Sequence, residues 1–262
     1  MAGAAGTETR RASSRPPTPA DCLLIPPALE DRVLFYHGFS RGPGRPEINR
    51  LGGEWSAGDA RAGDGLAGPG AALAGAEAKR GMTLTGLDRP LARPLTVLVW
   101  WRLDAPVGKQ SAYDLVGLHG EGWISNFVRS GPWCGLTEPT FVLQVYRWPG
   151  VTNVNHVHAG SGIVETGVWH HAAMVVARGS VVRVYWDGRE RADVHLKGRF
   201  LGTGDRAGTL ALGNRHGGHP MTVDEVLVLD VALPAGAVRD AMDAVRHLAD
   251  RALPAALSAD RF

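Results

Sequence analysis

Long apolar runs are missing from this sequence, and so is a concentration of charge of one sign. No apolar stretch approaches the length needed to cross a bilayer, so we expect no membrane insertion. Residues 1–20 lack the continuous apolar region of a secretory signal, which favours a cytoplasmic protein or one associated with a virion or another particle. The formal net charge is +2 and like charges form no long run, so we expect no nucleic-acid partner.

Cysteine is also scarce. The 2 cysteines, Cys22 and Cys134, are too far apart for a zinc motif, and neither has a Cys-x-x-Cys partner. They can be two free thiols, or one disulfide can tie the N-terminal segment to the domain. Because no secretory signal is present, reduced thiols are favoured.

Glycine, by contrast, is abundant. The chain contains 35 Gly, 17 Pro and 8 Trp, and only 21% of its 262 residues are charged, a composition that favours strands and turns over long helices. A chain of this length can form one large β-sandwich and bury roughly three-quarters of its unfolded surface. We therefore expect an all-β protein whose core needs no disulfide.

The segment GVWHHAAMVVARGSVVRVYWDG gives the clearest strand prediction. Trp169–Ala177 is apolar and rich in aromatic and β-branched residues, and Val181–Trp186 is the returning strand. Asp187-Gly188 is a strong signal for a second tight turn.

This hairpin resembles that of laminin-G-like domains of the concanavalin A-like lectin/glucanase superfamily, which show W-H-H-V-A and then an aromatic strand ending in D-G-K. LTVLVWWRL at Leu95–Leu103 resembles a second segment of that family. LALGN, from Leu210, and TVDEVLVLDVALP, from Thr222, resemble its C-terminal part. The resemblance covers about Leu95–Ala244. It implies a jelly-roll sandwich of two antiparallel sheets, with a short C-terminal helix over Ala235–Leu248.

The domain organisation follows from these segments. We expect a flexible or partner-ordered arm over residues 1–31, the sandwich over residues 32–248 and a tail over residues 249–262. Further strands are expected at Arg32–Phe39, Met82–Leu87, Ala112–Leu118, Phe141–Tyr146 and Val223–Leu229. The segment between Leu118 and Phe141 is expected to be a loop.

Alternation along strands predicts which side chains share a face. In the first strand, Val33, Phe35 and His37 should share one side. Trp100 and Trp101 should lie on opposite faces.

The hairpin markers of the family have structural roles in this prediction. Trp169 is expected to be mostly buried, and His171 to be satisfied by backbone hydrogen bonds. His170 and His171 should lie on opposite faces, so they cannot chelate one ion together.

Three tryptophans are candidate ligand contacts. Trp123, Trp133 and Trp148 lie in or beside predicted loops, where indole rings can stack on sugars or anchor a protein interface. The same residues can instead fasten a Gly-rich loop to the sandwich.

The segment NVNHVH supplies candidate polar contacts. His156 and His158 share one strand face, as do Asn153 and Asn155. The two imidazoles can bind a transition metal only with a third ligand, and none is evident nearby. An ordinary solvated strand face remains an alternative.

The acidic pair Asp224 and Glu225 opens the last predicted strand. The resemblance gives it a structural role, bonding nearby backbone or helping to hold calcium. Asp205 and Asn214 could add oxygens, but calcium needs six to eight ligands and the sequence reveals no complete set.

Catalytic motifs are missing. Laminarinase-like members of the superfamily carry E-x-D-x-x-E for glycoside hydrolysis, and this sequence contains neither that motif nor G-x-S-x-G or H-E-x-x-H. We therefore expect a non-enzyme: a binding module that recognises a glycan or a protein surface through loop aromatics. Two alternatives stay open. One is a structural protein of a virion, tail or particle, as a homo-oligomer or in a larger assembly, and the other is a divergent glycoside hydrolase.

Overall fold

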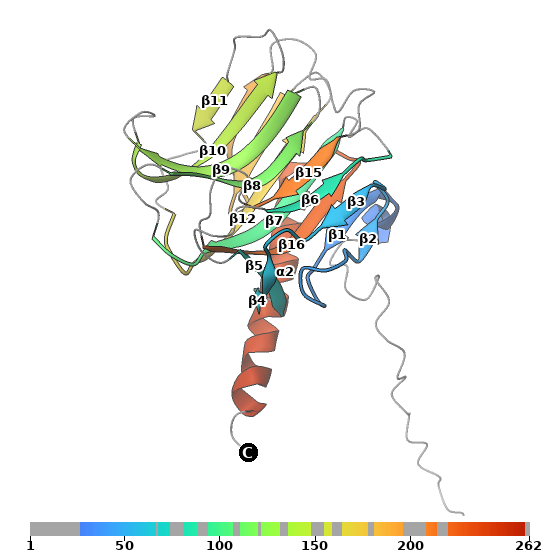
Figure 1. Cartoon of the computed structure of the whole chain (residues 1–262), viewed down its shortest axis with the longest axis vertical. Helices are drawn as coiled ribbons and strands as arrows, with labels where there is room; N and C mark the ends of the chain where they lie inside the picture. Colours follow the sequence, from blue (N-terminus) through green and yellow to red (C-terminus); the bar gives the residue numbers. More distant parts are fainter. Residues whose placement is uncertain are drawn as a thin grey trace, which may run out of the picture.

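Two stacked antiparallel sheets and a C-terminal α-helix make up the fold (Figure 1). The computed structural model describes residues 27–66, 68–73, 81–88, 94–106, 111–119, 122–131, 136–147, 155–158, 164–177, 181–195, 208–213 and 220–259. This architecture confirms the expected all-β jelly-roll sandwich.

The first sheet has the strand order β14-β13-β12-β7-β16-β1-β2, and β5 also pairs with β16 and with β4. Its strands are β1 (Val33–His37), β2 (Ile48–Asn49), β4 (Arg61–Asp64), β5 (Pro69–Leu73), β7 (Leu95–Leu103), β12 (Trp169–Val176), β13 (Val181–Trp186), β14 (Arg189–His195) and β16 (Met221–Leu229).

The second sheet has the order β11-β10-β9-β8-β15-β6-β3. Its strands are β3 (Glu54–Ser56), β6 (Met82–Thr85), β8 (Ser111–His119), β9 (Gly122–Gly131), β10 (Leu136–Arg147), β11 (Asn155–His158) and β15 (Thr209–Leu212). β9 and the first residues of β10 occupy most of the segment that was expected to be a loop, so that expectation is wrong.

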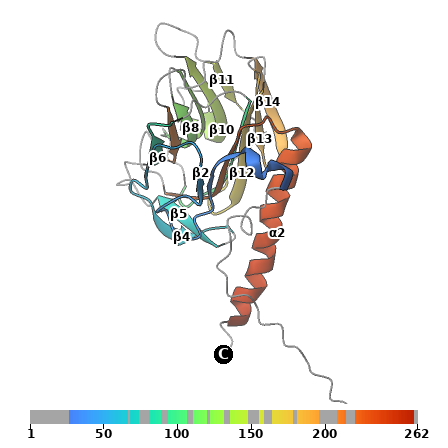
Figure 2. The same cartoon turned by 90° about the vertical axis from the view of Figure 1, so that its right-hand side faces the viewer.

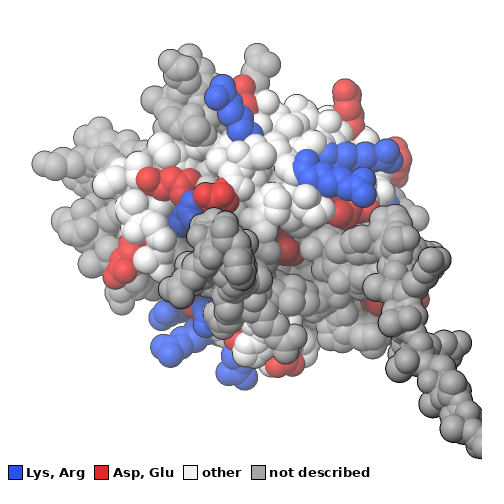
Figure 3. Space-filling model, turned by 90° about the horizontal axis from the view of Figure 1, so that it is seen from below, with Lys and Arg blue, Asp and Glu red and all other residues white. Residues whose placement is uncertain are grey.

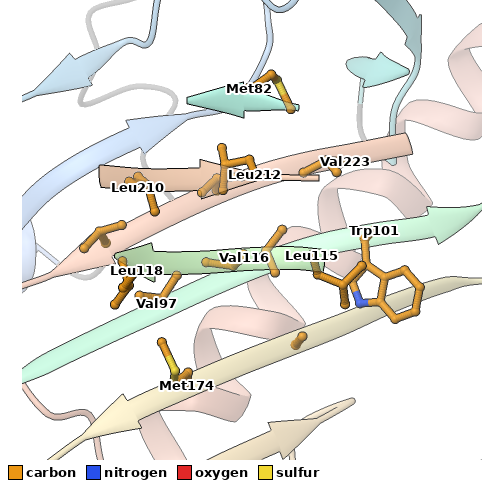
Figure 4. Packing of buried hydrophobic residues seen from close by; sticks show 14 of the residues in the cluster. Met82, Val97, Trp101, Leu115, Val116, Leu118, Met174, Leu210, Leu212 and Val223 are labelled. Carbon is orange, nitrogen blue, oxygen red and sulfur yellow. The ribbon is translucent and has the colours of Figure 1, made fainter. Parts of the chain in front are cut away.

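Apolar residues from both sheets form the main core between them (Figure 4). Trp101 in β7 is fully buried in this core, whereas Trp100 packs on the other side of the same sheet against Met242 and Val245. The expected placement of the two tryptophans on opposite faces is confirmed. Both faces of β7 are therefore covered, which explains why this strand is apolar along nearly its whole length.

Helix α2 (Ala235–Ala259) forms a third layer on the outer face of the first sheet (Figure 2). Val238, Met242 and Val245 recur at helical spacing and supply its buried residues. The helix is longer than the expected Ala235–Leu248, so residues 249–259 of the predicted tail are helical. Alanine and leucine, which are strong helix formers, dominate this extension, and the helix continues through Pro254.

Two expectations at the N-terminal side also need correction. Residues 27–31 of the expected arm belong to a 3-10 helix, Pro27–Arg32, whose Leu29 packs against the apolar cluster on the outer face of the first sheet. In β1 a bulge between Val33 and Phe35 breaks the alternation. Val33 therefore packs on the outer face of the first sheet, while Phe35 lies between the sheets.

The family hairpin forms as predicted. β12 pairs with β13, and β13 pairs with β14 through the two-residue turn Asp187-Gly188. Both turn residues have positive φ, 47° and 70°, as a tight hairpin turn of this kind requires. Trp169, at the start of β12, keeps only a minor part of its surface exposed and packs against the cluster of Trp100, Met242 and Val245, so the expectation of a mostly buried side chain is confirmed. Arg102 lies over its ring at 5.0 Å.

We predict that Gly188→Ala lowers the free energy of unfolding by about 1–2 kcal/mol. The positive φ disfavours a side chain, and a Cβ at this position would lie 3.0 Å from Arg239 Cγ and Met242 Cε of α2. Gly236→Ala is the matched control, because a Cβ there meets nothing within 4 Å. Urea denaturation measures both, and equal effects of the two variants would contradict the prediction.

Candidate functional site

The outer face of the second sheet collects several of the predicted contact residues. Val116 and Leu118 of β8 are buried between the sheets, so the alternate positions Gly117 and His119 belong to the outer face. In β9, the residues paired with these two are Ser125 and Trp123.

The same set of positions continues across the neighbouring strands. Trp123 pairs with Tyr146 and Ser125 with Gln144, both in β10, and Gln144 pairs in turn with His156 of β11. Strand spacing and rise place the Trp123 and His156 positions roughly 12 Å apart. Two cross-strand rows therefore run over this face, one of His119, Trp123 and Tyr146, and one of Gly117, Ser125, Gln144 and His156.

The structure brings together some of the predicted contacts and separates others. Trp123 lies in a strand rather than a loop, on the same face as His156 and His158. Asn155 pairs with Val145, which places it at a position of the opposite face. Trp133, Trp148 and Asn153 lie outside the described residues.

Sequence reasoning missed the other members of the two rows, notably Tyr146, Gln144 and His119. The alternation of Val142, Gln144 and Tyr146 was a usable signal, but it needed the pairing of β10 with β9 and β11 to show which residues lie beside Trp123.

Asp224 has a structural role within the first sheet. Its side chain is buried and its Oδ2 accepts a hydrogen bond from the Leu66 amide at 2.8 Å, while Oδ1 accepts one from the Glu225 amide at 2.9 Å. The carboxylate of Asp224 therefore binds backbone amides, which is one of the two roles expected for it, the other being calcium binding. The described residues contain no cluster of three or more His, Cys, Asp or Glu that could hold a metal, and Asp205 and Asn214 lie outside them.

A second carboxylate, that of Asp187, fastens the hairpin. Its Oδ1 accepts a hydrogen bond from the His171 amide at 2.8 Å, and its Oδ2 lies 2.9 Å from Nδ1 of His170. Burial alone would raise the pKa of Asp187, but these hydrogen bonds outweigh it and lower the pKa. The anion therefore ties β12 to the β13–β14 turn.

A model of the concanavalin A-like lectin/glucanases superfamily matches residues 77–239, more than half of the chain. The chain belongs to this superfamily. No curated protein matches the sequence.

Solved structures share the fold of this superfamily member at low sequence identity. The binding domain of Paraclostridial Mosquitocidal Protein 1 is 13% identical with a TM-score of 0.61, over 81% of this chain and 52% of that one. The binding domain of botulinum neurotoxin serotype D is 8% identical with a TM-score of 0.62, over 82% and 51%. The chain thus spans about half the length of these two domains.

A third neighbour is matched over nearly its whole length. Domain 4 of AbnA, a GH43 extracellular arabinanase from Geobacillus stearothermophilus, was solved in complex with arabinotriose. It is 18% identical with a TM-score of 0.59, over 80% of this chain and 98% of that domain. At these identities the likeness shows the fold alone.

Basic and acidic side chains are interspersed on the face drawn in Figure 3. Among the described residues, no helix has the length and apolar character that a membrane crossing requires.

The outer face of the first sheet holds one buried carboxyl group of interest, that of Glu225. Glu225 has a φ of 49° at a bulge of β16, and its Oε2 accepts a hydrogen bond from the Tyr36 hydroxyl at 2.7 Å. Burial raises the pKa of Glu225 to about 7, although the hydrogen bond from Tyr36 opposes the shift. Near it, hydrogen bonds from His37 and Ser40 outweigh burial and lower the pKa of Glu47 to about 2.

This raised pKa predicts a pH dependence of stability. The native state keeps the Glu225 proton up to about pH 7, whereas the unfolded chain releases it near pH 4.5. The native state therefore binds more protons in this window, and its stability falls as the pH rises, by an amount on the order of 1–3 kcal/mol. Glu225→Gln should remove this contribution to the pH dependence of the free energy of unfolding, which urea denaturation measures between pH 4.5 and about 7. Glu54→Gln, at an exposed position, is the control and should leave the pH dependence unchanged. If Glu225→Gln also leaves the pH dependence of the free energy of unfolding unchanged, the raised pKa of Glu225 is contradicted.

Proposed function

We propose that this protein is a non-catalytic binding module that recognises a neutral glycan on the outer face of its second sheet. The observation that carries the proposal is the cross-strand pairing of Trp123 with Tyr146, beside the polar positions Gln144 and His156. Aromatic side chains present flat apolar surface, and the polar tips of tyrosine and tryptophan also make hydrogen bonds.

The chemistry of these positions supports a neutral ligand. The two rows combine aromatic, imidazole, amide and hydroxyl groups, and none of their members carries a carboxylate or an ammonium group. Amides and hydroxyls both donate and accept hydrogen bonds, which suits the hydroxyl groups of a sugar. A charged ligand would instead favour arginine, lysine or acidic residues at these positions.

The comparisons support a binding function over a catalytic one. The arabinanase domain is matched almost completely and was solved with an arabinose trisaccharide, while the two toxin neighbours are binding domains. No E-x-D-x-x-E motif occurs in the sequence, which argues against the glycosidases of this superfamily.

We predict that Trp123→Ala weakens glycan binding by about tenfold or more, the loss expected when one aromatic anchor is removed. A glycan array first identifies a ligand, and isothermal titration calorimetry then compares the parent protein with Trp123→Ala. Trp169→Ala is the matched control, because Trp169 lies on the outer side of the first sheet and should leave the affinity unchanged. Circular dichroism verifies that each variant is folded.

Three results would overturn the proposal. The first is release of reducing sugar from a polysaccharide panel that a single Asp or Glu substitution abolishes, which would identify a hydrolase. The second is an array without ligands combined with self-assembly in light scattering, which would identify a structural protein. The third is a protein ligand whose affinity depends on Trp123.

A further inference from the structure

A groove that is partly open to solvent lies between helix α2 and the outer face of the first sheet, on the side of the molecule opposite the proposed glycan face. Its volume of about 30 Å³ exceeds the roughly 10–15 Å³ that one water needs, so it admits a larger group. Most of the lining side chains are apolar, which favours an apolar occupant. The lining residues are Tyr36, Leu98, Trp100, His171, Glu225, Leu227, Ala241 and Val245.

The two titratable side chains that border the groove beside Tyr36 are compatible with an apolar occupant. Burial raises the pKa of Glu225 to about 7, and its Oε2 already accepts a hydrogen bond from the Tyr36 hydroxyl. Burial lowers the pKa of His171 to about 4, so its ring is neutral near pH 7. The Nδ1 of His171 is buried and has no hydrogen-bond partner in the described part of the chain, so the expected backbone hydrogen bonds to this side chain are wrong at that atom.

The 3-10 helix Pro27–Arg32 brings the N-terminal side of the chain to this groove (Figure 2). Its Leu29 packs against an apolar cluster on the outer face of the first sheet, and that cluster includes Tyr36, Leu98 and Leu227 of the groove wall. Residues 1–26 therefore join the domain on the face that carries the groove.

Two hydrogen bonds hold this 3-10 helix in place. Arg50 Nη1 donates to the Glu30 carbonyl at 3.0 Å, and the Asp230 amide donates to the Arg32 carbonyl at 3.0 Å. Arg50 follows β2 and Asp230 follows β16. The junction with residues 1–26 is thus fixed relative to both strands.

The sequence next to this junction supplies a matching occupant. Residues 22–25 read Cys-Leu-Leu-Ile, and residues 1–21 contain no leucine, isoleucine, valine or phenylalanine. From Val33 to Tyr36 of the groove wall, β1 advances roughly 10 Å. The five residues before Pro27 span up to roughly 17 Å when extended. Residues 22–25 can therefore reach the groove by turning back along β1.

We propose that residues 22–25 dock their leucine side chains into the groove between α2 and β1 of the same chain. The docked segment covers Ala241 and the edges of Tyr36 and Leu227 that the groove leaves open. It fastens the N-terminal part of the chain to the layer that α2 forms.

A thiol cross-link in the full-length chain tests where the segment lies. Cys22 belongs to the segment, and Ala241→Cys places a second thiol in the groove wall. We expect a short bifunctional maleimide to join the two thiols within one chain, as shown by gel electrophoresis and peptide mass spectrometry. His247→Cys, at an exposed position of the same helix, is the matched control and should give little of this product. Equal yields from the two variants, or a link only between two copies of the chain, would overturn the proposal.

A pair of variants in the N-terminal segment tests the role of the leucines. The double variant Leu23→Ser with Leu24→Ser should lower the unfolding midpoint by about 3 °C or more, because apolar burial in the groove is lost. Ala20→Ser, outside the apolar segment, is the control and should leave the midpoint unchanged. An unchanged midpoint in the double variant would overturn the proposal. So would a lowered midpoint without the cross-link, since the leucines would then pack elsewhere on the domain.

Discussion

Replacement of Trp101 by alanine is expected to lower the free energy of unfolding by about 3–5 kcal/mol, the usual cost of deleting a large buried aromatic side chain. Trp101 has no exposed surface and lies between the two sheets. Its ring packs at 5.4 Å from that of Trp186 and at 5.7 Å from that of His170. The cavity left behind would be walled by rigid strands, which limits the relaxation that could fill it.

Two controls separate burial from residue type. Trp101→Phe keeps an aromatic ring and removes an indole nitrogen that has no partner among the described residues, so its cost should be clearly smaller. Trp169→Ala removes a tryptophan that keeps part of its surface exposed, so it should lower the free energy of unfolding by less than Trp101→Ala. Urea denaturation compares the three variants. A loss for Trp169→Ala that equals or exceeds that for Trp101→Ala would contradict the assignment of the core.

Local sequence was sufficient to predict the strands on which this core depends. Alternation predicts that Trp100 and Trp101 lie on opposite faces. In the structure Trp100 lies under α2 and Trp101 lies between the sheets. It also separated His170, which contacts Trp101 and Trp186, from His171, which contacts Trp100. These predictions succeeded because β7 and β12 pair without a bulge, so the period of two continues without interruption.

The predictions that failed depended on interactions outside the segment concerned. The bulge in β1 moves Val33 to the outer face, and the residue types of the segment V-L-F-Y-H do not predict a β-bulge. The glycines and serines of β9 are typical of turns and favour a loop, whereas pairing with β8 and β10 keeps the segment extended. Pairing with neighbours overrides weak local preferences in strands.

The candidate site could be predicted only in part for the same reason. Sequence singled out Trp123 and the pair His156 and His158, yet these lie more than thirty positions apart, and only the register of β9, β10 and β11 places them on one face. Tyr146 and Gln144 fill the strand between them and could not be recognised before that register was known.

Removal of the Asp224 carboxylate gives the second large effect that we expect. Asp224→Ala should lower the free energy of unfolding by about 2–4 kcal/mol, because it leaves two backbone amides, those of Leu66 and Glu225, without their acceptor in a buried place. Leu66 also packs against the cluster of Trp100, Met242 and Val245. Loss of its hydrogen bond should therefore loosen one edge of the layer that α2 forms.

The control and a metal titration distinguish this role from calcium binding. Asp64→Ala, on the exposed strand β4, should change stability by no more than about 0.5 kcal/mol. Because both oxygens of Asp224 already accept backbone hydrogen bonds, the cost of Asp224→Ala should be the same in calcium and in a chelator. A calcium-dependent rise in the unfolding midpoint that Asp224→Asn abolishes would show that the carboxylate binds metal instead. Denaturation in calcium and in chelator, on parent and variants alike, decides between the two roles.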